Sequence, residues 1–194
     1  MFRAIHIKKI INFFIFISIS IFLFFVVKHY YSEYLPLEHT EIIHNESKKY
    51  DLPPELICGI IRQESRFNKT AVSRKGASGL MQIMEDTAYW CAQKMGIEDF
   101  NYERDIFNPE INIKMGTWYL NHLINEMGDV NLAIISYNAG IGNVSRWLNE
   151  GTITPESDFS EIPFAETEKY IGRVLFFEKV YKVILEFDGG QDEK

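Results

Sequence analysis

Apolar residues recur every three or four positions along most of the chain after position 40, which is the spacing of one face of an α-helix. Prolines, glycines and capping residues divide this pattern into separate segments. We predict helices over 42–50, 54–67, 87–95, 109–127, 130–137, 143–148 and 166–187. Strand-like alternation never extends beyond a few residues, so the predicted fold class is all-α.

The helix predicted over 54–67 carries an acid on its apolar face. Its apolar residues are Leu56, Ile57, Ile60 and Ile61. Glu64 follows Ile60 by four residues and therefore continues this stripe, where partial desolvation would raise the pKa of its carboxyl group. Such a carboxyl stays protonated near neutral pH and can donate a proton. A structural glutamate at a helix end, paired with Arg62 or Arg66, is an equally open interpretation.

A second unusual polar residue lies in the segment that follows this helix. The stretch 69–79 is rich in serine and glycine and is typical of a loop. It leads into the apolar run Leu80–Met84, which Gln82 interrupts. Because a buried amide must be hydrogen-bonded, Gln82 either holds neighbouring backbone groups or points at a polar ligand.

The segment 130–137 is apolar on every side, which is typical of a short helix at the centre of a domain. It ends in Tyr137 and Asn138, followed closely by Gly140. These residues form either a helix-ending turn or a platform for a ligand. The sequence alone leaves both interpretations open.

An uncharged, strongly apolar stretch, Ile10–Val27, precedes all of these helices and approaches the length needed to cross a bilayer core of about 30 Å. Basic residues before it predict a cytoplasmic N-terminus and an exported domain. The flanking Val26–Tyr30 offers no small-residue cleavage site, so we favour an uncleaved transmembrane anchor over a signal peptide. The predicted organisation is a cytoplasmic basic tip at 1–9, a transmembrane anchor at 10–27, a linker at 28–41, a helical domain at 42–187 and a charged tail at 188–194.

Composition narrows the choice of partner. The chain of 194 residues is 46% hydrophobic and has a net charge of −7. Residues 1–28 hold four basic side chains, Arg3, Lys8, Lys9 and Lys28, and no acidic one, so the exported part is still more acidic. We therefore expect no binding to nucleic acid, and a neutral or locally cationic polymer is a better candidate.

The sequence suggests neither a metal nor a cofactor. Cys58 and Cys91 form a disulfide or are buried small residues, and both interpretations stay open. Two cysteines without clustered histidines do not make a zinc site. We find no phosphate-binding glycine loop and no serine–histidine pair of the nucleophile type.

Five blocks of this sequence together resemble the catalytic domain of the soluble-type lytic transglycosylases of bacterial cell walls, a family with a lysozyme-like fold. They occur in the family's order and with similar spacing over 42–187. The blocks are Ile61–Asn68, Gly76–Met84, Asn108–Ile113, Ser136–Gly140, and Ile162–Thr167 with Tyr170.

The resemblance implies a lysozyme-like helical domain with a groove for peptidoglycan glycan strands. It also implies cleavage of the β-1,4 bond between N-acetylmuramic acid and N-acetylglucosamine, with a 1,6-anhydro end as product. Glu64 would be the catalytic acid and then the base, without a cofactor. By family position, the residues expected to contact the glycan are Gln82, Met84, Tyr137, Asn138, Glu166 and Tyr170, with Ser73 as a further candidate.

The apolar stretch and the resemblance together give an expected location and assembly. A monomer would sit in the cell membrane through a single N-terminal helix. Its catalytic domain would lie outside the cytoplasm, facing the cell wall.

Two other functions remain open from the sequence. Glu85 stands where the family often has proline, and either Glu85 or its neighbour Asp86 could activate water. That would give a hydrolase similar to goose-type lysozyme, although both acids also suit the start of a helix. A non-catalytic glycan-binding module is the third interpretation, and the acid at position 64 argues against it because binding needs no proton donor.

Overall fold

The computed structural model describes residues 12–23, 25–26 and 34–189. The chain divides into two units, Met1–Leu37 and Glu38–Lys194. In the first unit, residues 12–23 and 25–26 are helical. The predicted tip at 1–9 lies outside the described residues, as do parts of the anchor at 10–27, the linker at 28–41 and the tail at 188–194. Within the described residues, no helix is both long and apolar enough to cross a membrane.

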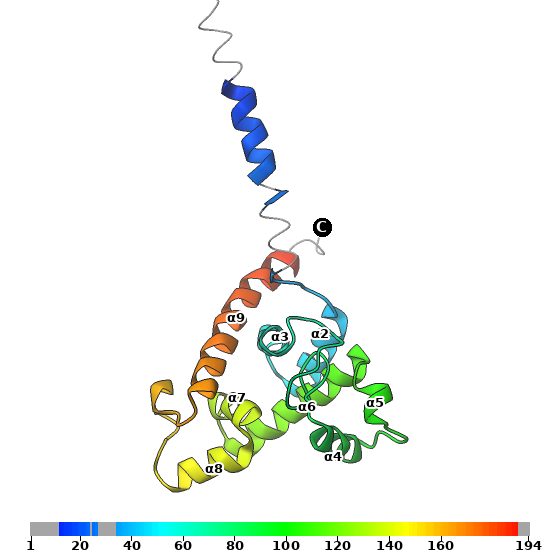
Figure 1. The fold of residues 1–194 in the computed structure, drawn as a ribbon, viewed down its shortest axis with the longest axis vertical. Coiled ribbons are helices and arrows are strands. Elements are labelled where there is room, and N and C mark those ends of the chain that lie inside the picture. The colour runs from blue at the N-terminus through cyan, green and yellow to red at the C-terminus, as the bar shows by residue number, and fades with distance from the viewer. Residues whose placement is uncertain (1–11, 24, 27–33, 190–194) are drawn as a thin grey trace, which may run out of the picture. The chain divides into compact units, whose positions relative to one another are not determined.

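The second unit is helical, which confirms the predicted all-α class (Figure 1). Among the described residues, the β-pairing consists of two isolated bridges, Val72 with Ser78 and Ser78 with Ile83. The helices are α2 (Thr40–Tyr50), α3 (Pro54–Glu64), α4 (Glu85–Met95), α5 (Tyr102–Asp105), α6 (Pro109–Met127), α7 (Val130–Ala139), α8 (Ile141–Asn149), the 3-10 helix η1 (Phe159–Glu161) and α9 (Ala165–Gly189).

The end of α3 differs from the prediction. The apolar pattern continues to Phe67, yet the helix ends at Glu64. Arg66 and Phe67 adopt left-handed backbone conformations, with φ of 56° and 64°, which no α-helix can continue. The acid therefore occupies the last turn of its helix, at the point where the chain leaves the core.

The start of α4 and the presence of α5 also differ from the prediction. Helix α4 begins at Glu85, before the predicted Thr87, because Met84 is already extended and serves as the N-cap. The short helix α5 was not predicted, since a segment of four residues has too few positions to show a period. Its Asn101 caps the first turn by accepting a hydrogen bond from the Arg104 N–H.

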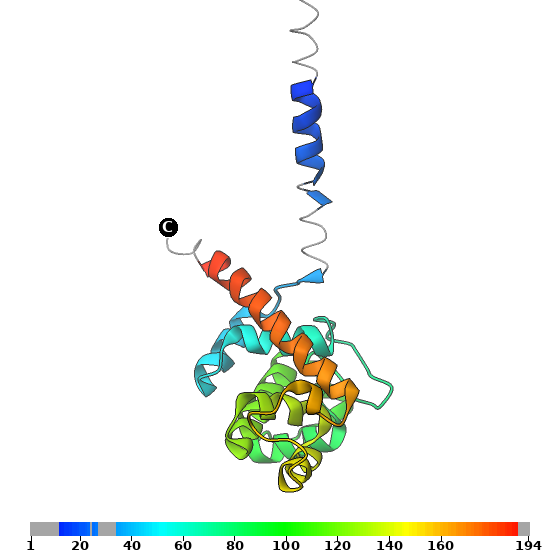
Figure 2. The same cartoon turned by 90° about the vertical axis from the view of Figure 1, so that its left-hand side faces the viewer.

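Helix α9 packs against α3, and this is the most extensive helix pair of the unit (Figure 1, Figure 2). Gly59 lies at the closest point, because a Cβ atom there would stand 3.0 Å from both the Glu178 nitrogen and the Val174 oxygen. The helices therefore approach to backbone contact at this level. From Gly59 to Glu64, the neighbours of α3 change from Glu178 to Tyr170, so the two helices run in opposite directions.

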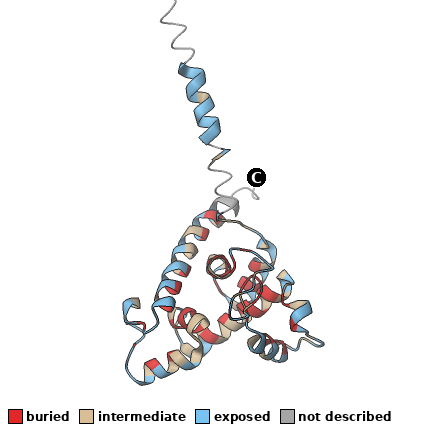
Figure 3. Ribbon diagram, in the orientation of Figure 1, coloured by how far each residue is buried: buried red, intermediate tan, exposed pale blue. Residues whose placement is uncertain are grey.

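The core surrounds α3 and α7. Helix α3 is buried along nearly its whole length (Figure 3). Helix α7 is buried from Leu132 to Ser136 and packs against α6, α8 and α9. Its uniformly apolar sequence is explained by this central position, as predicted.

One buried side chain fixes the loop between α3 and α4. Asn112 of α6 is fully buried, and its Oδ1 accepts a hydrogen bond of 2.7 Å from the Met81 N–H. Its Nδ2 donates to the Ser78 and Ile106 carbonyl oxygens at 3.1 and 2.9 Å. Gly79 has φ of 82°, and a Cβ atom there would collide with the Asn112 amide. This loop is therefore clamped to α6 at its base.

We expect Gly59→Ala to destabilise the domain by about 1–2 kcal/mol, because the α9 backbone cannot move away from the new methyl group without repacking. The matched control is Gly172→Ala on the exposed face of α9, where nothing lies within 4 Å of the new Cβ atom. That change should stabilise the protein by up to about 1 kcal/mol, through helix propensity. Urea unfolding of both variants measures the difference, and stabilisation by Gly59→Ala would contradict the close contact.

Candidate functional site

A groove of about 800 Å³ lies among the described residues. It is formed by the end of α3, the loop after it, the end of α7 and the start of α9. Its lining residues are Glu64, Ser73, Arg74, Lys75, Ala77, Gln82, Met84, Tyr137, Asn138, Ala139, Asn143, Phe164, Glu166 and Thr167. Seven of the eight residues singled out in the sequence line it, and the eighth, Tyr170, reaches it through Glu64.

Glu64 is the titratable centre of this groove. The Tyr170 hydroxyl donates a 2.7 Å hydrogen bond to its Oε1 atom. Burial raises the pKa of Glu64 to about 7, and the hydrogen bond from Tyr170 opposes this rise. Among the described residues, Glu64 forms no ion pair, so the suggested pairing with Arg62 or Arg66 is not found. The carboxyl group can therefore gain or lose a proton near neutral pH.

Two tyrosines, Tyr170 and Tyr137, lie near this carboxyl group and make its surroundings less polar than water. Tyr170 is 4% exposed, and burial followed by the nearby Glu64 raises its pKa well above the ordinary value. Burial and Glu64 raise the pKa of Tyr137 in the same way. Both phenols stay neutral across the range in which Glu64 titrates. The charge on Glu64 therefore changes without a compensating change in either tyrosine.

Of the two interpretations of Gln82 left open by the sequence, the structure shows the first. Its side-chain nitrogen donates to the Ala71 and Gly79 carbonyl oxygens at 3.1 and 2.9 Å, so it holds loop backbone. The residue also lines the groove, in a left-handed conformation with φ of 49°. Its carbonyl oxygen accepts no hydrogen bond within the described part of the chain. Next to it, Met84 is 44% exposed and presents a thioether to the groove.

The hydrogen bonds of the remaining predicted residues determine which atoms they offer. The Tyr137 hydroxyl donates to the Met81 carbonyl oxygen at 2.9 Å, so its ring rather than its hydroxyl lines the groove. Asn138 Oδ1 accepts from the Thr167 hydroxyl at 2.8 Å, which leaves the amide NH₂ as a donor. Ser73 Oγ accepts from the Ala77 N–H at 3.0 Å and keeps its own proton to donate.

The acids proposed as activators of water are not brought to Glu64. Glu85 and Asp86 lie in the first turn of α4, where negative charge favours the helix dipole. Neither lines the groove. Asp86 faces a different cavity, of about 300 Å³, lined also by Thr87, Trp90, Tyr119, His122, Leu123 and Ile141. The second carboxyl group of the groove is Glu166, in the first turn of α9.

Several residues of the groove were not predicted from the sequence. They are Arg74, Lys75, Ala77, Ala139, Asn143, Phe164 and Thr167. Thr167 directly follows a predicted residue, but the loop residues Arg74 and Lys75 carry no periodic signal. Cys58 and Cys91 are both buried and free, so the disulfide left open by the sequence is absent between them. Within the described residues, no group of three or more metal-binding side chains is found.

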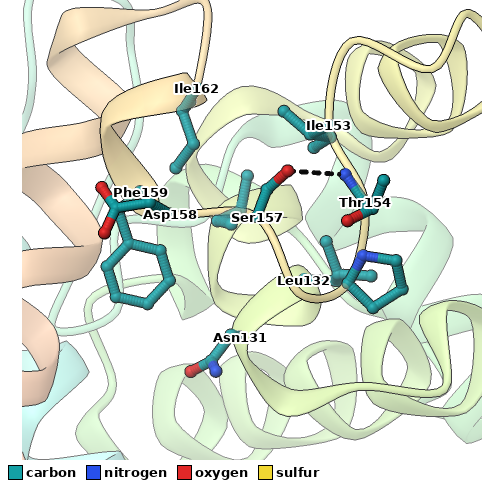
Figure 4. A pocket seen from close by; sticks show the side chains of 10 residues that line it. Asn131, Leu132, Ile153, Thr154, Ser157, Asp158, Phe159 and Ile162 are labelled. Atoms are coloured by element: carbon teal, nitrogen blue, oxygen red, sulfur yellow. Dashed lines mark hydrogen bonds between the residues drawn. The ribbon is translucent and has the colours of Figure 1, made fainter.

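A further cavity lies under the loop between α8 and α9 (Figure 4). Ser157 Oγ accepts from the Thr154 N–H at 2.9 Å and closes the loop over it. Its volume is about 10 Å³, which is close to the room one water molecule needs. No sugar fits there, so this cavity is not a candidate for the site.

A helical fold with an acid that forms no ion pair in an open groove is typical of enzymes that cleave glycans. The family model described as the transglycosylase SLT domain matches residues 41–159. The chain belongs to this family.

Similar proteins agree with the assignment. The soluble lytic murein transglycosylase of Salmonella typhimurium is 35% identical over 153 residues, which are 77% of this chain and 24% of that protein. The membrane-bound lytic murein transglycosylase C of Yersinia pestis is 32% identical over 175 residues, covering 77% of this chain and 47% of that protein. The chain thus spans about a quarter of the soluble relative and about half of the membrane-bound one.

Solved structures of the family have the same fold. An inactive mutant of the lytic transglycosylase Slt from Pseudomonas aeruginosa matches with a TM-score of 0.71 and 32% identity, over 80% of this chain and 26% of that one. A 70-kDa soluble lytic transglycosylase in complex with bulgecin A matches with a TM-score of 0.72 and 31% identity, over 82% of this chain and 26% of that one.

The raised pKa of Glu64 predicts a cost in stability that depends on pH. The pKa is about 7 in the folded state against an ordinary value of 4.5, so stability falls as pH rises from 4.5 to 7 and stays low above. We expect Glu64→Gln to be more stable than wild type by up to about 3 kcal/mol above pH 7, and equally stable below pH 4.5. Unfolding curves between pH 4 and pH 8 measure this, and a constant difference would contradict the raised pKa.

The hydrogen bond from Tyr170 favours the charged form of Glu64. We therefore expect Tyr170→Phe to raise the pKa of Glu64 above its wild-type value of about 7. A ¹³C NMR titration of labelled glutamate measures this pKa, with Glu64→Gln identifying the resonance. The control is Tyr89→Phe, at an exposed tyrosine on α4. An unchanged or lower pKa in Tyr170→Phe would show that the hydrogen bond does not act on the carboxylate.

Proposed function

We propose that this protein is a peptidoglycan lytic transglycosylase that cleaves the β-1,4 bond between N-acetylmuramic acid and N-acetylglucosamine. The observation that carries the proposal is the carboxyl of Glu64, with a pKa of about 7, in a groove of about 800 Å³. A general acid works best when its pKa lies near the working pH. The lytic murein transglycosylases to which the chain is similar support this assignment of substrate.

The proposed reaction needs one carboxyl group. Protonated Glu64 gives its proton to the glycosidic oxygen as the bond from C1 to that oxygen breaks, and an oxocarbenium-like state forms at C1. The C6 hydroxyl oxygen of the same sugar then attacks C1, and the Glu64 carboxylate takes the hydroxyl proton. The products are a 1,6-anhydro end and a free 4-hydroxyl, no water is consumed, and Glu64 is protonated again. Because the attacking group is tethered, a second carboxylate is not required.

The other groove residues have roles in holding the glycan. We assign the Asn138 amide as a donor to an acetamido carbonyl, because Thr167 already occupies its oxygen. The Gln82 carbonyl oxygen is placed to accept from a sugar hydroxyl or amide. Met84 and the Tyr137 ring provide apolar contact for sugar faces, and Tyr170 positions Glu64. Ser73 and Glu166 would contact the strand at the rim of the groove.

We also propose that residues 10–27 anchor the protein in the cell membrane, with the 42–187 domain outside the cytoplasm and facing the wall. Support comes from the uncharged sequence of this stretch, the basic residues before it and the helical conformation of residues 12–23. Phe13, Phe14, Phe16 and Phe22 are at least 60% exposed there, as residues that face lipid would be. The tip at 1–9, the linker at 28–41 and the tail at 188–194 complete the proposed organisation.

The test of this function is digestion of purified sacculi by the full-length protein, followed by mass spectrometry of the released muropeptides. We expect 1,6-anhydro ends from wild type and a loss of about 10²- to 10⁴-fold in Glu64→Gln. Glu55→Gln, on the same helix and outside the groove, is the matched control and should retain activity. If wild type and Glu64→Gln both leave sacculi intact, the non-catalytic glycan-binding alternative replaces the proposal.

The same assay separates the proposed reaction from hydrolysis. A hydrolase of the goose-lysozyme kind would release reducing ends without anhydro ends. Asp86→Asn and Glu85→Gln should leave the product unchanged, because neither acid lines the groove. Glu166→Gln should weaken binding but still give anhydro ends. If wild type releases reducing ends and one of these three variants does not, the acid replaced in that variant activates the water.

A further inference from the structure

Two cations stand at the tip of a tight turn in the loop that borders the groove. Ser73, Arg74, Lys75 and Gly76 form this turn, because the Gly76 N–H donates to the Ser73 carbonyl oxygen at 3.0 Å. The Ser73 N–H donates to the Ala77 carbonyl oxygen at 2.8 Å, and this bond joins the two chain segments that lead into and out of the turn. Arg74 and Lys75 are therefore its two central residues, and both line the groove.

The base of the turn is held from the inside of the domain. The buried Tyr102 hydroxyl lies 2.9 Å from the carbonyl oxygens of both Gly76 and Ile83. The Ser78 hydroxyl donates to the Gly76 carbonyl oxygen at 3.2 Å. The turn is thus attached to α5 and to the end of its own loop. The backbone that carries the two cations is therefore held in place beside the groove, which reduces the entropy lost when a ligand binds.

Both cations are exposed, and neither forms an ion pair with any residue of the described ranges. The groove's other charged groups are Glu166 and Glu64, which is half protonated near pH 7. The chain as a whole is acidic, with a net charge of −7. Two adjacent unpaired cations beside a groove therefore form a local positive potential that attracts an anion. A neutral glycan backbone would make no use of them.

We propose that Arg74 and Lys75 form a carboxylate-binding site for the acidic substituent of the muramic acid sugar, which deepens the proposed function and rests on it. The ligand group is a carboxylate of the peptide attached to that sugar or, where no peptide is attached, the lactyl carboxylate itself. The Arg74 guanidinium can bind a carboxylate through two parallel hydrogen bonds, and Lys75 adds a flexible point charge. The turn thereby selects glycan strands that carry acidic substituents over neutral ones.

The test measures binding to the full-length Glu64→Gln protein, which holds the glycan without cleaving it. Three ligands are compared: peptide-bearing glycan strands, strands stripped by an amidase so that only lactyl carboxylates remain, and the neutral chitohexaose. We expect the double variant Arg74→Gln, Lys75→Gln to bind carboxylate-bearing strands about tenfold more weakly, because an exposed charge contributes only modestly to binding. Its affinity for chitohexaose should not change. Unchanged chitohexaose binding also shows that the groove is still folded. Lys94→Gln, on the exposed face of α4, is the matched control.

Each pattern of binding loss leads to one conclusion. Loss for the stripped strand alone assigns the lactyl carboxylate, loss for the peptide-bearing strand alone assigns the peptide carboxylate, and loss for both shows that the turn binds either group. Equal loss for all three ligands, or no loss for any, overturns the site, as does a difference that survives 1 M salt, since exposed charges are screened there. The absence of anhydro products from wild type would instead refute the proposed function, whatever the binding results.

Discussion

The close approach of α3 and α9 is the constraint on which the candidate site depends. Gly59 has no side chain to separate the two helices, so their backbones meet at the level of Val174 and Glu178. Because the helices run in opposite directions, the same contact brings Tyr170 to the last turn of α3, within 2.7 Å of Glu64. An acid at a helix end is thereby enclosed on the side of α9 and open on the side of the groove.

The wall of the groove beside Glu64 is a loop, and its shape comes from hydrogen bonds made by distant residues. Asn112 of α6 holds Met81 and Ser78, and Tyr102 of α5 holds the turn at Gly76. Gln82 supports the same loop with its amide nitrogen while its other face lines the groove. Supporting hydrogen bonds of this kind hold the residues that a loop presents to a ligand in place.

The environment of Glu64 favours reactivity over stability. Burial raises its pKa to about 7, so the ionised form is disfavoured in the folded protein at neutral pH. Tyr170 reduces this penalty without abolishing it, because a neutral hydroxyl offers one hydrogen bond and no charge. A carboxyl held between its two protonation states suits a group that must first donate and then accept a proton. Perturbed pKa values of this kind cluster at functional sites for the same reason.

The sequence by itself determined the all-α class, the central position of α7 and the apolar setting of Glu64, because helical periodicity is a local property of consecutive residues. The family blocks also identified six residues of the groove before their positions were known, and Ser73 was a further candidate from the loop. Only the tertiary structure decided that α3 ends at Glu64, that Tyr170 is its partner, and that Glu85 and Asp86 lie outside the groove. The placement of Arg74 and Lys75 beside the groove was also decided there. These features depend on backbone angles and on contacts between residues far apart in the chain, which no local pattern records.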